Sequence, residues 1–135
     1  MSKENTTYAV VELKVTGTLD TVVAASAGCP NDRTAIDVWL SRFRHTVLAC
    51  AGVLWRERSG LRVRFDTVVR TAVPVVSGQD AVGRLRAADA ARAAVPTGAL
   101  VRVEKATSRV IRVLEPWPNE AVCSAYRRSR NYRPA

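Results

Sequence analysis

The sequence predicts an α+β fold, a two-layer sandwich in which a mostly antiparallel sheet carries two helices on one face. Three observations predict it. Apolar and polar residues alternate at 8–16 and again from 61 to 73, which indicates strands with one buried face. Apolar residues at helical spacing lie between these two stretches. Short turn sequences join neighbouring strands, which implies antiparallel pairing. The expected order is β-α-β-β-α-β-β, with a ferredoxin-like arrangement as one candidate topology.

The first strand is expected at about 8–16. Its apolar side consists of Ala9, Val11, Leu13 and Val15. Gly17 is expected to end the strand, because glycine is unfavourable in strand interiors. The segment 19–27 stays open between a second short strand and a connecting piece.

The first helix is expected to begin at Pro30, Asn31 and Asp32, which supply a stop and a cap, and to end near Gly52. His45 is predicted to lie on this helix, off its apolar stripe, where a solvated or capping role is favoured over catalysis. The stripe consists of Ile36, Leu40, Phe43, Val47 and Ala51.

Two hairpins and a second helix are expected to follow. The first hairpin turns at Ser59-Gly60, with strands at 53–58 and from 61 to Pro74. The second helix is expected from Ser77 to about 94, with a thin stripe of Val82, Leu85 and alanines. The second hairpin is predicted to pair Ala99–Glu104 with Arg109–Leu114 across a turn at 105–108.

Composition places the chain among globular proteins. It has 135 residues, 47% of them hydrophobic, and its 21 Lys+Arg against 12 Asp+Glu give a formal charge of +9. We expect a single basic domain at 1–118 and an Arg/Tyr-rich tail at 119–135. The polar start MSKENTTY and the lack of a long apolar run predict no secretory signal and no membrane partner. Three scattered cysteines fit an intracellular, reducing compartment.

Sequence motifs for catalysis are weak. The chain has one histidine, no CxxC or HxxxH, and no glycine-rich phosphate loop, so we expect neither an enzyme nor a cofactor or metal. A small enzyme with an unrecognised pocket stays a third alternative. Its candidate ionisable groups are Asp37, His45 and Asp66.

Basic residues form three clusters. The first surrounds the predicted turn at Ser59-Gly60 and consists of Arg56, Arg58, Arg62 and Arg64. In a tight hairpin, Arg58 would face Arg62, or Arg56 would face Arg64. Such pairs are destabilising unless an anion binds them. Partial neutralisation by Glu57 and Asp66 is an equally good explanation.

The second cluster lies on the second predicted hairpin and consists of Arg102, Lys105, Arg109 and Arg112. If both hairpins share a sheet, their outward faces could merge into one basic surface. The third cluster is in the tail, where arginine alternates with tyrosine: Tyr126, Arg127, Arg128, Arg130, Tyr132 and Arg133. This composition is typical of segments that contact nucleic acid, although a solubilising tail is the simpler alternative.

These patterns favour a non-enzymatic, nucleic-acid-binding structural or assembly protein, with RNA favoured over DNA. A ribonucleoprotein subunit and a nucleic-acid-packaging viral or phage structural protein both fit. No strand carries the aromatic run of an RNA-recognition motif, so charge and shape would dominate binding. The main alternative is a protein-interaction module with an acidic protein partner. A homo-oligomer is compatible with either function.

Overall fold

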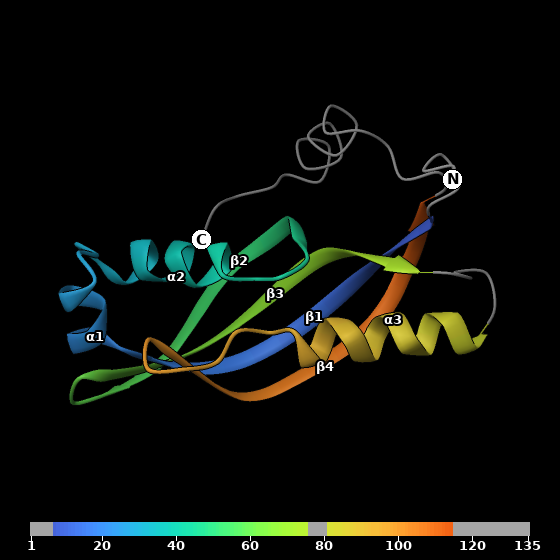
Figure 1. Cartoon of the computed structure of the whole chain (residues 1–135). Helices are drawn as coiled ribbons and strands as arrows, with labels where there is room; N and C mark the ends of the chain where they lie inside the picture. Colours follow the sequence, from blue (N-terminus) through green and yellow to red (C-terminus); the bar gives the residue numbers. More distant parts are fainter. Residues whose placement is uncertain (1–6, 76–80, 115–135) are drawn as a thin grey trace.

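The computed structural model describes residues 7–75 and 81–114. Its strands and helices follow one another in a βααββαβ order (Figure 1). In chain order they are β1 (Thr7–Asp20), α1 (Thr21–Ser26), α2 (Asp32–Ser41), β2 (Thr46–Ser59), β3 (Arg62–Val75), α3 (Ala81–Ala93) and β4 (Val101–Leu114). Within the described ranges, no helix combines the length and the apolar character needed to cross a membrane.

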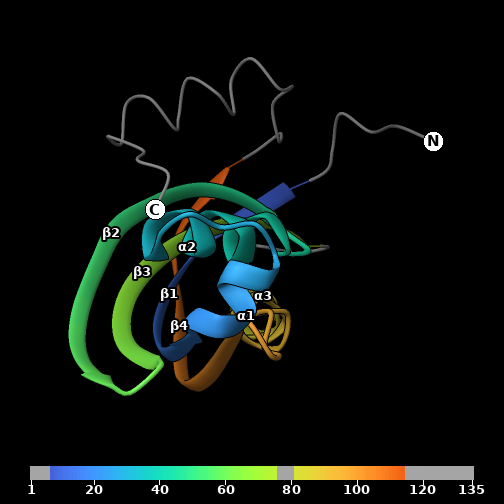
Figure 2. The same ribbon diagram turned by 90° about the vertical axis from the view of Figure 1, so that its left-hand side faces the viewer.

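The four strands form one sheet in the order β2-β3-β1-β4, with every neighbouring pair antiparallel. Each helical connection therefore joins two parallel strands that flank a third, which is the ferredoxin-like arrangement. The strands bend around the three helices, which share the concave side of the sheet (Figure 2). The predicted α+β sandwich is confirmed. We call the helix-covered side of the sheet the inner face and the opposite side the outer face.

Strand β1 is longer than predicted, because Gly17 does not end it. A Cβ at Gly17 would lie 3.1 Å from the ring of Phe65 and 3.2 Å from Val101. Glycine here lets the neighbouring strands pack closely, so it serves the sheet instead of breaking it. The open segment 19–27 resolves into the end of β1 and α1, which the Asp20 carboxylate caps.

The predicted first helix is correct only in its first half. Asn31 caps α2 as expected, with its side chain accepting from the Thr34 amide at 2.8 Å, but α2 ends at Ser41. Val47 lies in β2 opposite Thr71 of β3, because β3 offers a hydrogen-bonding edge along its whole length. His45 accordingly lies just before β2, not on a helix. Gly52 forms a bulge at φ +106°, where glycine is favoured, and not a helix end.

The second predicted hairpin does not form, since 101–114 is one strand. Residues 105–108 contain no Gly, Pro, Asn or Asp to reverse the chain. Strand β1 pairs with β4 along almost its whole length, and the register shifts near Val10 and Gly17 leave Ile111 and Glu104 of β4 without a register partner. The sheet therefore has four strands where the sequence predicted five.

Helix α3 lies within the predicted range, but a different side of it faces the sheet. Val82 and Leu85 are 57% and 65% exposed, whereas Ala87, Ala88 and Ala91 are buried. Small side chains let the helix approach the sheet closely, so the alanines form the contact face. The expected Ser77 cap lies outside the described residues.

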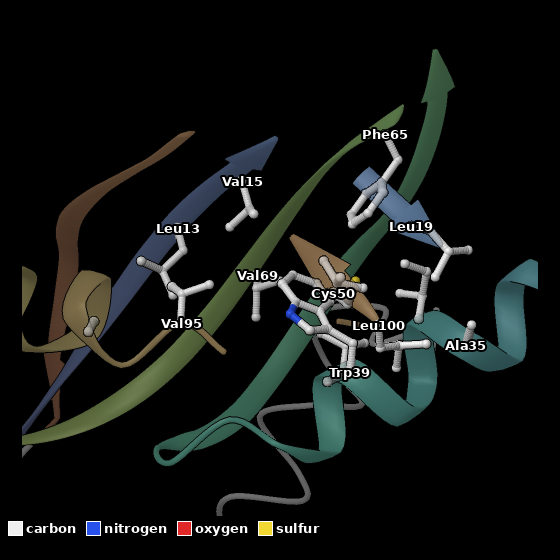
Figure 3. Packing of buried hydrophobic residues seen from close by; sticks show 14 of the residues in the cluster. Leu13, Val15, Leu19, Ala35, Trp39, Cys50, Phe65, Val69, Val95 and Leu100 are labelled. Atoms are coloured by element: carbon white, nitrogen blue, oxygen red, sulfur yellow. The ribbon is translucent and has the colours of Figure 1, made fainter. Parts of the chain in front are cut away.

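The main core fills the space between the inner face and the helices (Figure 3). Trp39 of α2 lies at its centre, edge-on to Phe65 at 5.8 Å, and its indole N–H donates to the Pro96 carbonyl at 2.8 Å. Cys50 is buried beside them, as a core thiol is expected to be. This core fixes the inner face of every strand and so determines which side chains point outward.

Candidate nucleic-acid interface

The outer face follows from the alternation along β1 and β3. The odd-numbered residues of both strands contribute to the main core, so their even-numbered residues point to the outer face. On β1 these include Glu12, Lys14, Thr16 and Thr18. Residues paired in register on neighbouring strands form a row across the sheet. The register therefore shows which side chains lie next to one another.

The hairpin between β2 and β3 has the predicted turn, with Gly60 at φ +62°, but its arginines do not face one another. A register shift between Trp55 and Glu57 places Glu57 opposite Arg64. Ser59 lies opposite Arg62. The expected like-charge pairs are therefore absent, because the bulge moves the arginines of β2 out of line with those of β3.

The arginines of this first cluster also divide between the two faces. Arg58 lies opposite the inner-facing Val63 and pairs with Asp32 of α2 at 2.8 Å. Arg56 pairs with the outer-face carboxylate of Asp66 at 2.7 Å. Arg64 pairs with Glu104 of β4 at 3.3 Å. Three of the four predicted site arginines are thus bound to carboxylates of the protein itself.

The second cluster lies along β4, with its side chains on the outer face. Arg102 pairs in register with Thr18, Lys105 with Thr16, Arg109 with Glu12 and Arg112 with Val10. The structure therefore brings the basic residues of β4 onto the same face as Arg56, Arg62 and Arg64. One long strand produces the shared surface that the sequence analysis attributed to two hairpins.

One row of this face is neutralised internally. Glu12 is 7% exposed and accepts hydrogen bonds from Arg109 at 3.1 Å and from Arg70 at 3.3 Å. Burial alone would raise the pKa of Glu12, but the two guanidinium groups outweigh it and hold the pKa below its ordinary value of 4.5. Glu12 thus fixes two cations in place.

Four other cations on the outer face form no ion pair with any residue that the structure describes. They are Lys14, Arg62, Arg102 and Lys105. Sequence reasoning missed Lys14 and Arg70 as site residues, although their place in the alternating pattern already put both on the polar side of their strands.

A groove of about 720 Å³ crosses the outer face from β4 to the edge strand β2, where Arg33 of α2 also lines it. Lys14, Lys105 and Thr107 line it from β1 and β4, and Leu54 and Arg56 line it from β2. Asp66 is its carboxylate, and hydrogen bonds from Thr16 and Arg56 lower the pKa of Asp66. This carboxylate is already bound by Arg56, whereas Lys14 and Lys105 form no ion pair with any residue that the structure describes.

The three ionisable groups of the enzyme alternative do not form one site. Asp66 lies on the outer face, whereas Asp37 lies on α2 over the inner face. Burial raises the pKa of Asp37, and one of its carboxylate oxygens is buried without a hydrogen bond. Burial, with a smaller effect of Arg44, lowers the pKa of His45. Among residues 7–75 and 81–114, no three His, Cys, Asp or Glu side chains gather as a metal site would require.

The predicted tail residues lie outside the described part of the chain. These are Tyr126, Arg127, Arg128, Arg130, Tyr132 and Arg133. Comparisons of the chain with protein-family models, curated proteins and solved structures find no match. We therefore infer function from the charges and shape of the outer face.

Proposed function

We propose that the protein is a non-enzymatic, nucleic-acid-binding structural or assembly protein that contacts RNA phosphates through its outer face. One observation carries the proposal. Four cations, Lys14, Arg62, Arg102 and Lys105, lie on one face and form no ion pair with any described residue, and the two lysines line a groove. Like charges gathered on a surface repel one another, and a bound polyanion would relieve that repulsion.

The groove has the chemistry of a phosphate track. Lys14 pairs in register with Thr107, and Lys105 pairs with Thr16, so the two ammonium groups belong to neighbouring rows. Alternate residues on one face of a strand repeat every ~7 Å, which lets flexible lysines reach successive anionic groups. Thr107 is exposed between them and offers a hydroxyl to a phosphate or a sugar.

The width of the sheet favours RNA over duplex DNA. Four strands spaced by ~4.8 Å span about 14 Å before their side chains are counted. The major groove of DNA is only about 12 Å wide and admits a helix or a two-stranded ribbon. A broad sheet fits better against a single strand or the wide, shallow minor groove of an RNA helix, where 2′-hydroxyls are displayed.

Two kinds of protein fit this proposal, a subunit of a ribonucleoprotein particle and a viral or phage structural protein that packages nucleic acid. Both need sequence-tolerant contacts to phosphate. The described lining of the groove contains no aromatic side chain, which supports binding there by charge and not by stacking. The Arg/Tyr-rich tail stays a prediction from the sequence.

The first test is gel filtration with light scattering on protein purified at low salt, with absorbance recorded at 260 and 280 nm. If nucleic acid is bound, we expect a high 260/280 ratio that falls to that of protein alone in high salt. Fluorescence anisotropy with a single-stranded RNA should then give a log–log salt slope near −3, from four phosphate contacts at ~0.7 each. A clean protein spectrum and no binding would contradict the proposal and favour an acidic protein partner.

A further inference from the structure

A second hollow, of about 420 Å³, lies beside the edge strand β2. Asn31 and Asp32 at the start of α2 form one side, and Trp55, Glu57 and Arg58 of β2 form the other. Its volume lies within the range of pockets that hold small ligands. The phosphate contacts proposed above make no use of this hollow.

The charges of this hollow differ from those of the groove on the outer face. Arg58 is bound to Asp32 at 2.8 Å, and Glu57 adds a second carboxylate. Arg33 and Arg56 also line the hollow, and Arg56 is bound to Asp66, so most of its charged side chains are already paired within the protein. A neutral ligand with hydrogen-bonding edges suits such a lining, because carboxylates accept from the amino groups of nucleobases.

Trp55 gives the hollow an aromatic wall. Its indole packs against Phe65, with ring centroids 5.8 Å apart and a tilt of 58°. This contact with a fully buried ring holds Trp55 in place, yet the residue is only partly buried and lines the hollow. A fixed, accessible indole is the kind of platform on which unpaired bases stack.

The hollow and the groove meet at the same side chains. Arg33 of α2 and Arg56 of β2 line both of them. Arg56 lies at the register shift between Trp55 and Glu57 on the edge strand, where the linings of the groove and the hollow adjoin. A strand of nucleic acid in the groove is therefore within reach of Trp55.

We infer that this hollow receives one unpaired base of a single-stranded RNA, stacked on Trp55, while phosphates of the same strand lie along Lys14 and Lys105. The inference rests on the proposed function and adds a preference to it. A duplex keeps its bases stacked on each other, so only an unpaired strand can supply a base to Trp55. The protein should bind single-stranded RNA more tightly than a duplex of the same length.

The test compares Trp55→Leu and Trp55→Phe in the full chain. We expect Trp55→Leu to weaken binding of a single-stranded RNA at least about fivefold. Its salt slope should stay unchanged, because stacking releases no counterions. Trp55→Phe should stay within about twofold of the unaltered protein. Phe43→Leu, which removes a partly buried aromatic outside both hollows, is the matched control and should leave affinity unchanged.

Photo-cross-linking covers the case in which Trp55→Leu fails to fold. The unaltered protein is irradiated with an RNA that carries 4-thiouridine, and the adduct is mapped by mass spectrometry. A cross-link at Trp55 supports the inference, and adducts confined to β1 and β4 overturn it. If folded Trp55→Leu protein binds RNA as tightly as the unaltered protein, the inference about the hollow is wrong but the proposed function stands. If the unaltered protein does not bind RNA, the proposed function is wrong as well.

Discussion

Two neighbouring rows of side chains on the outer face differ in whether their cations are paired with a carboxylate. In the Glu12 row, a nearly buried carboxylate on β1 binds Arg70 of β3 and Arg109 of β4. Two residues along β1, Lys14 lies between Val68 and Thr107, so neither neighbouring strand places a carboxylate opposite it. The first row uses its cations to hold three strands together, and the second leaves its cation available to a ligand.

The contrast shows why a count of arginines is a poor guide to a binding surface. Arg56, Arg58, Arg64, Arg70 and Arg109 are exposed or partly exposed, yet each is paired with a carboxylate of the protein. The informative feature is the absence of a described partner at particular rows. If the two rows differ in function as they differ in pairing, substitutions in the Glu12 row should affect stability and substitutions in the Lys14 row should affect RNA binding.

Glu12→Gln should have the largest effect on stability. The change leaves two guanidinium groups without their carboxylate and weakens charge-assisted hydrogen bonds. We therefore expect the free energy of unfolding, measured in urea, to fall by about 2 kcal/mol. Glu104→Gln is the control, because Glu104 is more exposed than Glu12 and should cost at most about 1 kcal/mol. Equal losses for the two variants would show that the Glu12 row is not the structural one.

The same row should control acid stability. The folded protein holds the pKa of Glu12 below 4.5, so its contribution is present above pH 4.5 and is lost as the pH falls through the lower, folded value. Thermal melting from pH 6 to pH 3 should therefore show a steeper decline for the unaltered protein than for Glu12→Gln. Parallel curves for the two proteins would contradict this assignment.

Thr107→Glu should give the Lys14 row a carboxylate, as the Glu12 row already has. A carboxylate opposite Lys14 would neutralise one phosphate contact, so RNA affinity should fall about fivefold at 0.1 M salt and the slope should shrink by ~0.7. Thr107→Gln keeps the size without the charge and serves as the control. An unchanged slope for Thr107→Glu, measured by anisotropy, would remove Lys14 from the interface.

Arg92→Gln should have the smallest effect. Arg92 of α3 is paired with Asp89 and lines neither the groove nor the hollow, so we expect RNA affinity to stay within about twofold. Its exposed ion pair should contribute at most about 1 kcal/mol to folding. A loss of affinity as large as that of Thr107→Glu would mean that the charge of either face attracts RNA equally.

The sequence predicts those elements whose pattern comes from a single buried face. β1 and β3 alternate because one side of each packs on the helices, and the caps of α2 are local. The end of α2 is not local, since Phe43 and Val47 fit a helical stripe equally well and pairing of β2 with β3 decides the outcome. The unbroken β4 likewise depends on β1 as a partner of matching length.

In the candidate site, too, local patterns predict some features and contacts between distant segments determine the others. Alternation alone places Arg62, Arg64 and Lys14 on the polar sides of their strands. The pairing of Arg64 with Glu104, and the position of Arg58 on the inner side, depend on a bulge at Arg56 and on contacts between distant segments. These contacts determine which cations lack an ion pair, and they cannot be predicted from the spacing of residues in the sequence.

Binding of RNA by the outer face is tested most directly by comparing the salt dependence of affinity for two double variants with the same loss of charge. Lys14→Gln/Lys105→Gln removes the groove cations, and Arg42→Gln/Arg86→Gln removes exposed cations from α3 and the end of α2. We expect the first to lower affinity about 25-fold at 0.1 M salt and to reduce the slope by about 1.4, and the second to change neither appreciably. Equal effects of the two double variants would show that net charge, and not the outer face, binds the nucleic acid.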